Sequence, residues 1–142
     1  MSELSRYFFL LGALPYVVFG ILHALMTPVT PDQMKGLTPR DLTFRIAMSQ
    51  ETVLLTRRTN VWLGWVGFNF SHSLGLVAFG IVGILVGRSR ASFSDQRAVF
   101  VPLAVVVSLL YLILGLRYWF RSPIIVSAFA CACFLISWIL MA

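Results

Sequence analysis

The chain has 142 residues, of which 59% are hydrophobic and 11% charged, and its mean hydropathy is +0.90. Soluble domains carry about 25% charged residues, so this composition excludes a water-soluble fold and predicts an integral membrane protein. The formal net charge of +6 fits basic flanks that contact a lipid bilayer with anionic headgroups, and it implies no nucleic-acid partner. The length allows about four spans and no separate soluble domain. We therefore expect a single transmembrane domain, 1–142.

Four apolar runs follow one another along the chain, each close to the length that crosses a hydrocarbon core. They cover approximately 7–26, 61–86, 99–116 and 124–141. All five acidic residues and nearly all the basic residues fall between these runs. This pattern predicts an all-α fold, a four-helix transmembrane bundle.

Lysine and arginine are divided unequally between the two sides of such a bundle. One side holds four of them, Arg6, Arg88, Arg90 and Arg97, and the other holds seven, Lys35, Arg40, Arg45, Arg57, Arg58, Arg117 and Arg121. The more basic side is expected to be cytoplasmic, which places both termini outside the cytoplasm. An aromatic belt is expected at the basic interface, formed by Trp62, Trp65, Tyr118 and Trp119.

The longest connection, 27–60, is expected to contain an amphipathic helix at approximately 39–57. Thr38 would cap this helix, Pro39 suits its first turn, and Asp41 favours the positive end of its dipole. The expected apolar face comprises Leu42, Ile46 and Val53, and the polar residues are Arg40, Arg45, Gln50 and Glu51. Such a helix would lie along the membrane surface. The alternative is one long helix that continues into the second span.

Small residues recur at multiples of four along the second apolar run, broken only by Phe79. They are Gly67, Ser71, Gly75, Gly83 and Gly87. Small side chains let a neighbouring helix backbone approach closely, so this row predicts a helix-packing face. The expected closest partner is the first run, and the face would serve either packing within the bundle or dimerisation.

A polar segment lies well inside the second run, comprising Asn69, Ser71, His72 and Ser73. Unsatisfied polar groups cost several kcal/mol in hydrocarbon, so these side chains are expected to face the bundle interior, a partner or a cavity. The other histidine of the chain, His23, lies near the end of the first run. The two histidines would lie on facing helices if the long connection folds back.

His23 and His72 allow three interpretations. They form interhelical hydrogen bonds, or they ligate a haem or chlorophyll as a pair or singly, or they take part in quinone or proton chemistry. A metal site made of protein ligands alone is not expected, because no carboxylate lies in a run. Cys131 and Cys133 would point to different sides of one helix and cannot complete such a site.

Further polar groups at helical spacing lie in the first and third runs. Tyr16 precedes His23 by seven residues, and Ser108 and Tyr111 lie in the third run. These three side chains would either complete a polar pocket with the histidines or pack as ordinary interhelical contacts.

No catalytic residues are predicted. Ser71 and Ser73 flank His72, but neighbours in a helix do not face each other as a nucleophile and its base must. A proton-coupled exporter is also not expected, because it would hold a membrane-embedded carboxylate.

Three functions therefore stay open. The first is a structural or accessory subunit that packs as a homo-oligomer or against a larger membrane complex. The second is an electron-transfer subunit that uses His23 and His72 with haem, chlorophyll or quinone. The third is a small channel or transporter for a neutral or anionic solute. The segments GILHAL and GFNFSHSLG give the chain a resemblance to small bacterial four-helix membrane proteins, which implies a bacterial inner membrane location and no specific function.

Overall fold

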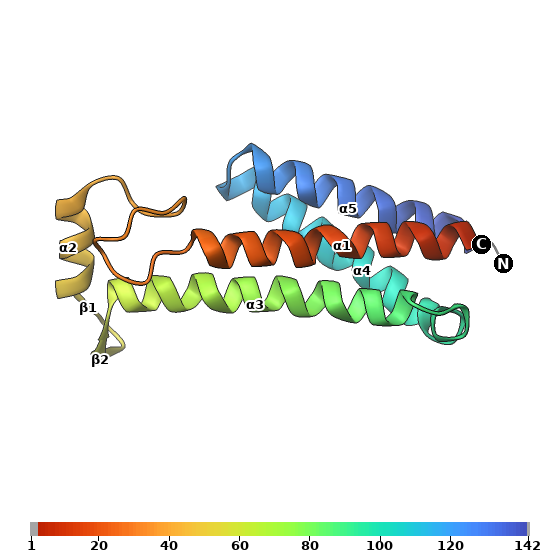
Figure 1. Ribbon diagram of the computed structural model, residues 1–142, viewed down its shortest axis with the longest axis horizontal. Helices are drawn as coiled ribbons and strands as arrows, with labels where there is room; N and C mark the ends of the chain where they lie inside the picture. The colour runs from red at the N-terminus through yellow and green to blue at the C-terminus, as the bar shows by residue number, and fades with distance from the viewer. Residues whose placement is uncertain (1–2, 142) are drawn as a thin grey trace. The chain divides into compact units, whose positions relative to one another are not determined.

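The structure is a computed structural model that describes residues 3–141; residues 1, 2 and 142 of the predicted domain lie outside this range. Its elements in chain order (Figure 1) are α1 (Glu3–Met26), α2 (Leu42–Gln50), β1 (Thr52–Val53), β2 (Thr56–Asn60), α3 (Val61–Gly87), α4 (Arg90–Tyr118) and α5 (Arg121–Ile139). Four of the helices, α1, α3, α4 and α5, are long and apolar enough to cross a membrane. The predicted all-α fold with four spans is confirmed.

The helix α4 begins well before the apolar run that predicted it. Ser89 forms its N-cap, because the Ser89 Oγ accepts a hydrogen bond from the backbone N of Ser92 at 3.1 Å. The 29 residues of α4 correspond to about 43 Å of helix, whereas the hydrocarbon core is about 30 Å thick. The charged first turns of α4 therefore extend beyond the hydrocarbon.

The chain divides into two compact units. One, here called the four-helix unit, runs up to Val18 and resumes from Val77, and it contains residues of α1, α3, α4 and α5. The other, here called the loop unit, is Phe19–Leu76 and contains α2 and the β-hairpin. Helices α1 and α3 each supply residues to both units.

Aromatic side chains from all four spans form the core of the four-helix unit. The ring of Phe9 in α1 lies 5.4 Å from the rings of Phe93 in α4 and Phe134 in α5, measured between centroids. Phe79 of α3 makes an edge contact with Tyr16 at 4.8 Å. Tilted and edge-on ring pairs are the favoured arrangements of aromatic side chains, so these contacts join the four helices around one core.

Helices α1 and α3 approach each other closely in the four-helix unit because α3 carries glycines there. A Cβ atom added at Gly80 would lie 2.8 Å from the backbone N of Val17 and 2.9 Å from the backbone O of Ala13. A Cβ atom added at Gly83 would lie 2.8 Å from the Cβ of Ala13. The backbone atoms of Val17 and Ala13 cannot move aside easily, so position 80 requires glycine.

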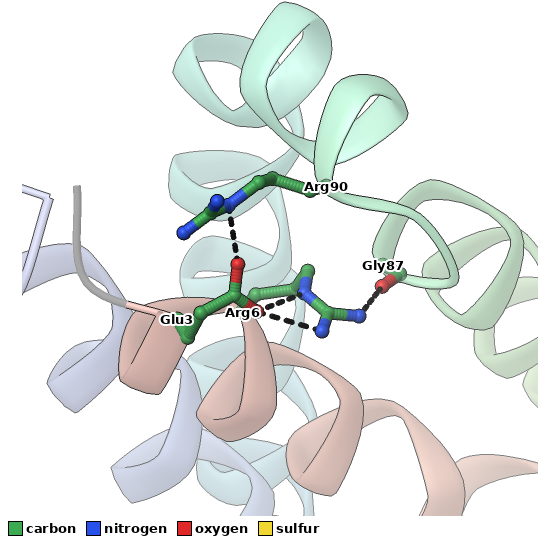
Figure 2. Close-up of polar contacts among 4 residues, drawn as sticks. All are labelled: Glu3, Arg6, Gly87 and Arg90. Carbon is green, nitrogen blue, oxygen red and sulfur yellow. Dashed lines mark hydrogen bonds and ion pairs between the residues drawn. The ribbon is translucent and has the colours of Figure 1, made fainter.

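Charged residues hold the end of the four-helix unit where α1 begins (Figure 2). The Arg6 guanidinium forms an ion pair with Glu3 at 2.8 Å and donates a hydrogen bond to the carbonyl O of Gly87 at 3.1 Å. Arg90, at the start of α4, pairs with the other carboxylate oxygen of Glu3. Because the last carbonyls of a helix have no partner within it, Arg6 satisfies one at the end of α3.

In the loop unit, the amphipathic helix exists but is shorter at both ends than the expected 39–57. It begins after Asp41, whose side chain accepts hydrogen bonds from the backbone N atoms of Thr43 and Phe44 at 2.7 and 3.2 Å. The expected cap, Thr38, instead takes part in a turn, where its Oγ1 accepts from the backbone N of Lys35 and donates to the O of Gln33. Asp41 thus ends the turn and starts α2.

The helix also stops at Gln50, and residues 52–60 form an antiparallel hairpin in place of more helix. Thr52 pairs with Asn60 and Val53 with Thr56, with a register irregularity between Thr52 and Val53. β-Branched residues favour strands over helix, which explains why the helix does not continue into α3. The alternative of one long helix through 39–86 is therefore wrong.

Arg45 of α2 departs from the predicted polar face. Arg45, expected on the polar face, is 5% exposed and donates hydrogen bonds from Nη1 to the carbonyl O of Pro31 and from Nε to that of Asp41. Leu42 and Ile46, expected on the apolar face, are 52% and 45% exposed, as a face in contact with the membrane surface requires. Arg45 is buried because its guanidinium donates hydrogen bonds to these two carbonyl oxygens.

Trp62 is part of the core of the loop unit instead of the predicted aromatic belt. It packs with Met48 and Val66 and is 2% exposed. Its indole N–H donates to the carbonyl O of Val29 at 3.0 Å. This contact ties the loop that follows α1 to the start of α3.

We predict that Gly80→Ala lowers the free energy of unfolding by about 1 to 3 kcal/mol, because the added methyl overpacks against backbone atoms. Gly64→Ala is the matched control in the same helix, since a Cβ there meets no described atom within 4 Å. This control is expected to be neutral or to stabilise by up to about 1 kcal/mol through helix propensity. Equilibrium unfolding of the detergent-solubilised protein measures both, and equal effects would contradict the close approach of α1 and α3.

Candidate functional site

Two groups of polar side chains lie within the spans, one in each unit. The histidine cluster, in the loop unit, comprises His23 and Thr27 from the end of α1 and its following residue, with Asn69, His72 and Ser73 from α3. The tyrosine cluster, in the four-helix unit, comprises Tyr16, Ser108 and Tyr111. The polar residues that the sequence grouped as one intramembrane set therefore belong to two different units.

A hydrogen bond between helices forms the centre of the histidine cluster. The Nε2 of His23 lies 3.0 Å from the Oδ1 of Asn69, and the Nδ2 of Asn69 donates to the carbonyl O of Trp65 at 2.8 Å. Both residues are buried, at 8% and 3% exposed. Because the amide nitrogen of Asn69 is committed to Trp65, its oxygen faces His23 as an acceptor. The Nε2 of His23 then carries a proton and donates it to this oxygen.

The remaining polar members of the cluster bond to backbone carbonyls. Thr27 Oγ1 donates to the O of His23 at 2.8 Å, and Ser73 Oγ donates to the O of Asn69 at 2.9 Å. Among the described residues, no buried side-chain nitrogen or oxygen lacks a hydrogen-bond partner. The arrangement thus satisfies the polar groups that hydrocarbon would leave unpaired.

His72 completes the cluster beside His23. The two imidazole rings lie 5.2 Å apart between centroids at 67°, an edge contact, and the ring of Phe68 stacks on His72 at 6.1 Å. The structure therefore brings the only two histidines of the chain into direct contact. It leaves Ser71 outside the cluster, because Ser71 is exposed and its Oγ donates to the carbonyl O of Phe68 in its own helix.

This geometry restricts how the histidines could ligate a cofactor. A haem held by both histidines lies between their rings, whereas these rings touch. The Nε2 of His23 is bound to Asn69, so ligation through His23 would use Nδ1, the nitrogen nearer its own helix backbone. His72 is half-buried whereas His23 is buried, so His72 is the more accessible ligand of the two. Within residues 3–141, no group of three or more His, Cys, Asp or Glu side chains could hold a metal ion.

The tyrosine cluster links α1 to α4. Tyr16 is 2% exposed and its hydroxyl donates to the Oγ of Ser108, which is fully buried, at 2.9 Å. The ring of Tyr111 lies 5.8 Å from that of Tyr16. Tyr16 thus combines a polar bond with the aromatic core, as buried tyrosines usually do.

A third polar contact between spans involves residues outside the predicted polar set. Ser5 of α1 donates from Oγ to the carbonyl O of Ser137 in α5 at 2.8 Å, and Ser137 returns the same bond to the O of Ser5 at 2.8 Å. Both serines are almost completely buried. Each serine lies near the end of a span, where polar residues are common, so its position alone does not predict a contact.

The structure divides the predicted helix-packing face of α3. Gly83 and Gly87, with Gly80, pack against α1 in the four-helix unit. In the loop unit, a Cβ added at Gly67 or Gly75 would meet no described atom within 4 Å. Positions four apart drift by about 40° around a helix, so one row cannot keep to a single face from Gly67 to Gly87.

Comparison with protein-family models finds no match to this chain, and comparisons with curated proteins and with solved structures find none either. The class that the fold defines is a small multi-pass integral membrane protein with four candidate spans.

We predict that the His23–Asn69 hydrogen bond has a coupling energy of about 0.6 kcal/mol and no more than about 1.7 kcal/mol, the range found for polar pairs within membranes. A double-mutant cycle of His23→Ala and Asn69→Ala, followed by unfolding in mild detergent, measures it. The control cycle pairs His23→Ala with Ser71→Ala and should show no coupling, since Ser71 bonds only within α3. Coupling of equal size in both cycles would show that the bond is not the cause.

Proposed function

We propose that this chain is a non-enzymatic structural or accessory membrane subunit that associates with a second copy of itself through α3. The observation that carries the proposal is the unfilled small-residue face in the loop unit. Gly67 and Gly75 each offer space that no described atom occupies within 4 Å, and Ser71 is exposed. The glycines further along α3 are filled by α1.

Helix association in lipid depends on close packing, because lipid chains are as apolar as the helices they surround. A row of small residues at spacing four, such as Gly67, Ser71 and Gly75, allows the backbones of two helices to approach closely. A two-fold axis places the same row of each copy against the other and closes the contact. A second copy therefore fits the face without requiring an additional complementary surface.

The polar clusters support a structural role over catalysis. Their hydroxyl and amide groups are engaged in hydrogen bonds between or within helices. Groups held in this way fix how helices pair and offer no activated nucleophile to a substrate.

We predict that Gly75→Leu abolishes self-association in liposomes, because its side chain fills the space that the second helix would occupy. Energy transfer between donor- and acceptor-labelled copies, measured as protein is diluted into lipid, reports the dimer. Ala128→Leu is the matched control, since it adds similar bulk to an exposed position on α5. Wild-type protein that shows no energy transfer above random proximity would refute self-association, and retained transfer in Gly75→Leu would refute this face.

A second candidate function is cofactor binding at the histidine cluster, favoured by the 5.2 Å separation of the His23 and His72 rings. His72 would be the axial ligand of a haem or chlorophyll, with His23 beside it, in an electron-transfer subunit.

The absorbance spectrum of the protein purified in mild detergent, oxidised and then reduced with dithionite, tests this second function. A Soret band that shifts on reduction, or a far-red pigment band, is expected if a cofactor is bound, and His72→Ala should remove it. A spectrum with tryptophan and tyrosine absorbance alone, both from native membranes and after purification, would refute this function.

A further inference from the structure

The tip of the β-hairpin exposes two leucines outside the four spans. Leu54 and Leu55 form the turn between β1 and β2, and they are 109% and 94% exposed. These are the highest values among the large exposed hydrophobic side chains of residues 3–141. An apolar tip of this kind needs an apolar environment, because leucine transfer out of water is favourable.

Turn chemistry does not account for the two leucines. Tight turns favour Gly, Asn, Asp, Pro and Ser, which either adopt unusual backbone angles or bond to the turn. No described residue adopts a positive φ, so the backbone of this turn would accept small polar residues and does not require leucine. A residue type that local structure does not require is more often selected for contact with something else.

The hairpin lies close to the point where α3 enters the bilayer. β2 ends at Asn60 and α3 begins at Val61, with no residue between them, and this junction belongs to the loop unit (Figure 1). Six residues of strand span about 20 Å at most, so Leu55 lies within that reach of Val61. The tip can therefore reach the interface between headgroups and hydrocarbon when Val61 lies at the membrane boundary.

Basic residues follow the tip directly. Arg57 and Arg58 are both exposed, and the chain carries no acidic residue from Thr52 until Asp95. Neighbouring positions on a strand point to opposite faces, so the hairpin presents positive charge on both sides. Arginine binds phosphate oxygens with two parallel hydrogen bonds, which matches the headgroups of anionic lipids.

The exposed face of α2 adds apolar surface in the same unit. Leu42 and Ile46 share this face and are 52% and 45% exposed, and none of the three large exposed apolar residues of α2 belongs to a span. The third, Phe44, lies about 160° away around the helix and is 56% exposed. Inward, α2 uses the guanidinium of Arg45 and the side chain of Met48. The apolar side of this segment is thus turned away from the protein.

We propose that the β1–β2 hairpin is a membrane wedge. Leu54 and Leu55 insert about 5 to 10 Å into the boundary between headgroups and acyl chains. Arg57 and Arg58 bind the phosphates of anionic lipids in the same leaflet. The wedge acts on lipid alone and does not depend on self-association through α3.

The test places a fluorophore at the tip of the full-length chain in liposomes. Cys131→Ala and Cys133→Ala remove the native thiols, and Leu54→Cys is labelled with a polarity-sensitive dye. The matched control carries the dye at Arg40→Cys, an exposed position before α2. Lipids with a spin label high on the acyl chain quench a dye that reaches their depth. Vesicles contain phosphatidylcholine alone or with phosphatidylglycerol.

The wedge predicts blue-shifted emission and strong quenching at Leu54, with little of either at Arg40. It also predicts that Arg57→Gln with Arg58→Gln reduces the quenching in anionic vesicles to the level in neutral ones. Emission at Leu54 that stays red and unquenched in both vesicle types would overturn the wedge. A blue shift that lipid does not quench, and that fades as protein is diluted, would also overturn it and assign the tip to a protein partner. Unchanged quenching after loss of both arginines would overturn the headgroup contact.

Discussion

Lipid offers no hydrogen-bond partners, so polar side chains inside a span must find them within the protein. The first span meets this constraint by bonding to each of the other three. Ser5 bonds to α5, Tyr16 to α4 and His23 to α3. Within each unit, α1 is therefore held by specific bonds, to α5 and α4 in the four-helix unit and to α3 in the loop unit, as well as by apolar packing. Apolar packing by itself gives little specificity in lipid.

These three residues are eleven and seven positions apart along the chain, and at about 100° per residue they fall within about 20° of one line on the helix. Gly12 and Phe9 lie within about 40° of the same line and are also buried. The sequence contained this signal, a polar and small-residue seam at the spacing of helices in bundles. The glycine rows by themselves do not contain it.

The spans were predictable because the thickness of the bilayer fixes the length of an apolar run. The loop was harder to predict, because its structure depends on contacts between residues distant in sequence. Arg45 is buried by carbonyls of Pro31 and Asp41, and Trp62 by the carbonyl of Val29 and the side chain of Met48. A pattern of apolar residues along one helix does not show which carbonyl groups of a distant loop lack a hydrogen-bond donor. For the same reason the sequence could propose His23 and His72 as neighbours but not the role of Asn69, which orients the imidazole.

The direct passage from β2 into α3 fixes the rotation of the helix about its own axis. The backbone N of Val61 donates to the O of Glu51 at 2.9 Å, and Thr52 pairs with Asn60, so the first residue of the span is held to the hairpin. One residue added or removed at this junction turns everything after it by about 100°. Such a change would carry Asn69 away from His23 while leaving hydropathy untouched. The length of this segment is consequently under tighter constraint than its composition. Related chains should therefore differ in the residue types between Thr52 and Asn60 more readily than in the number of residues.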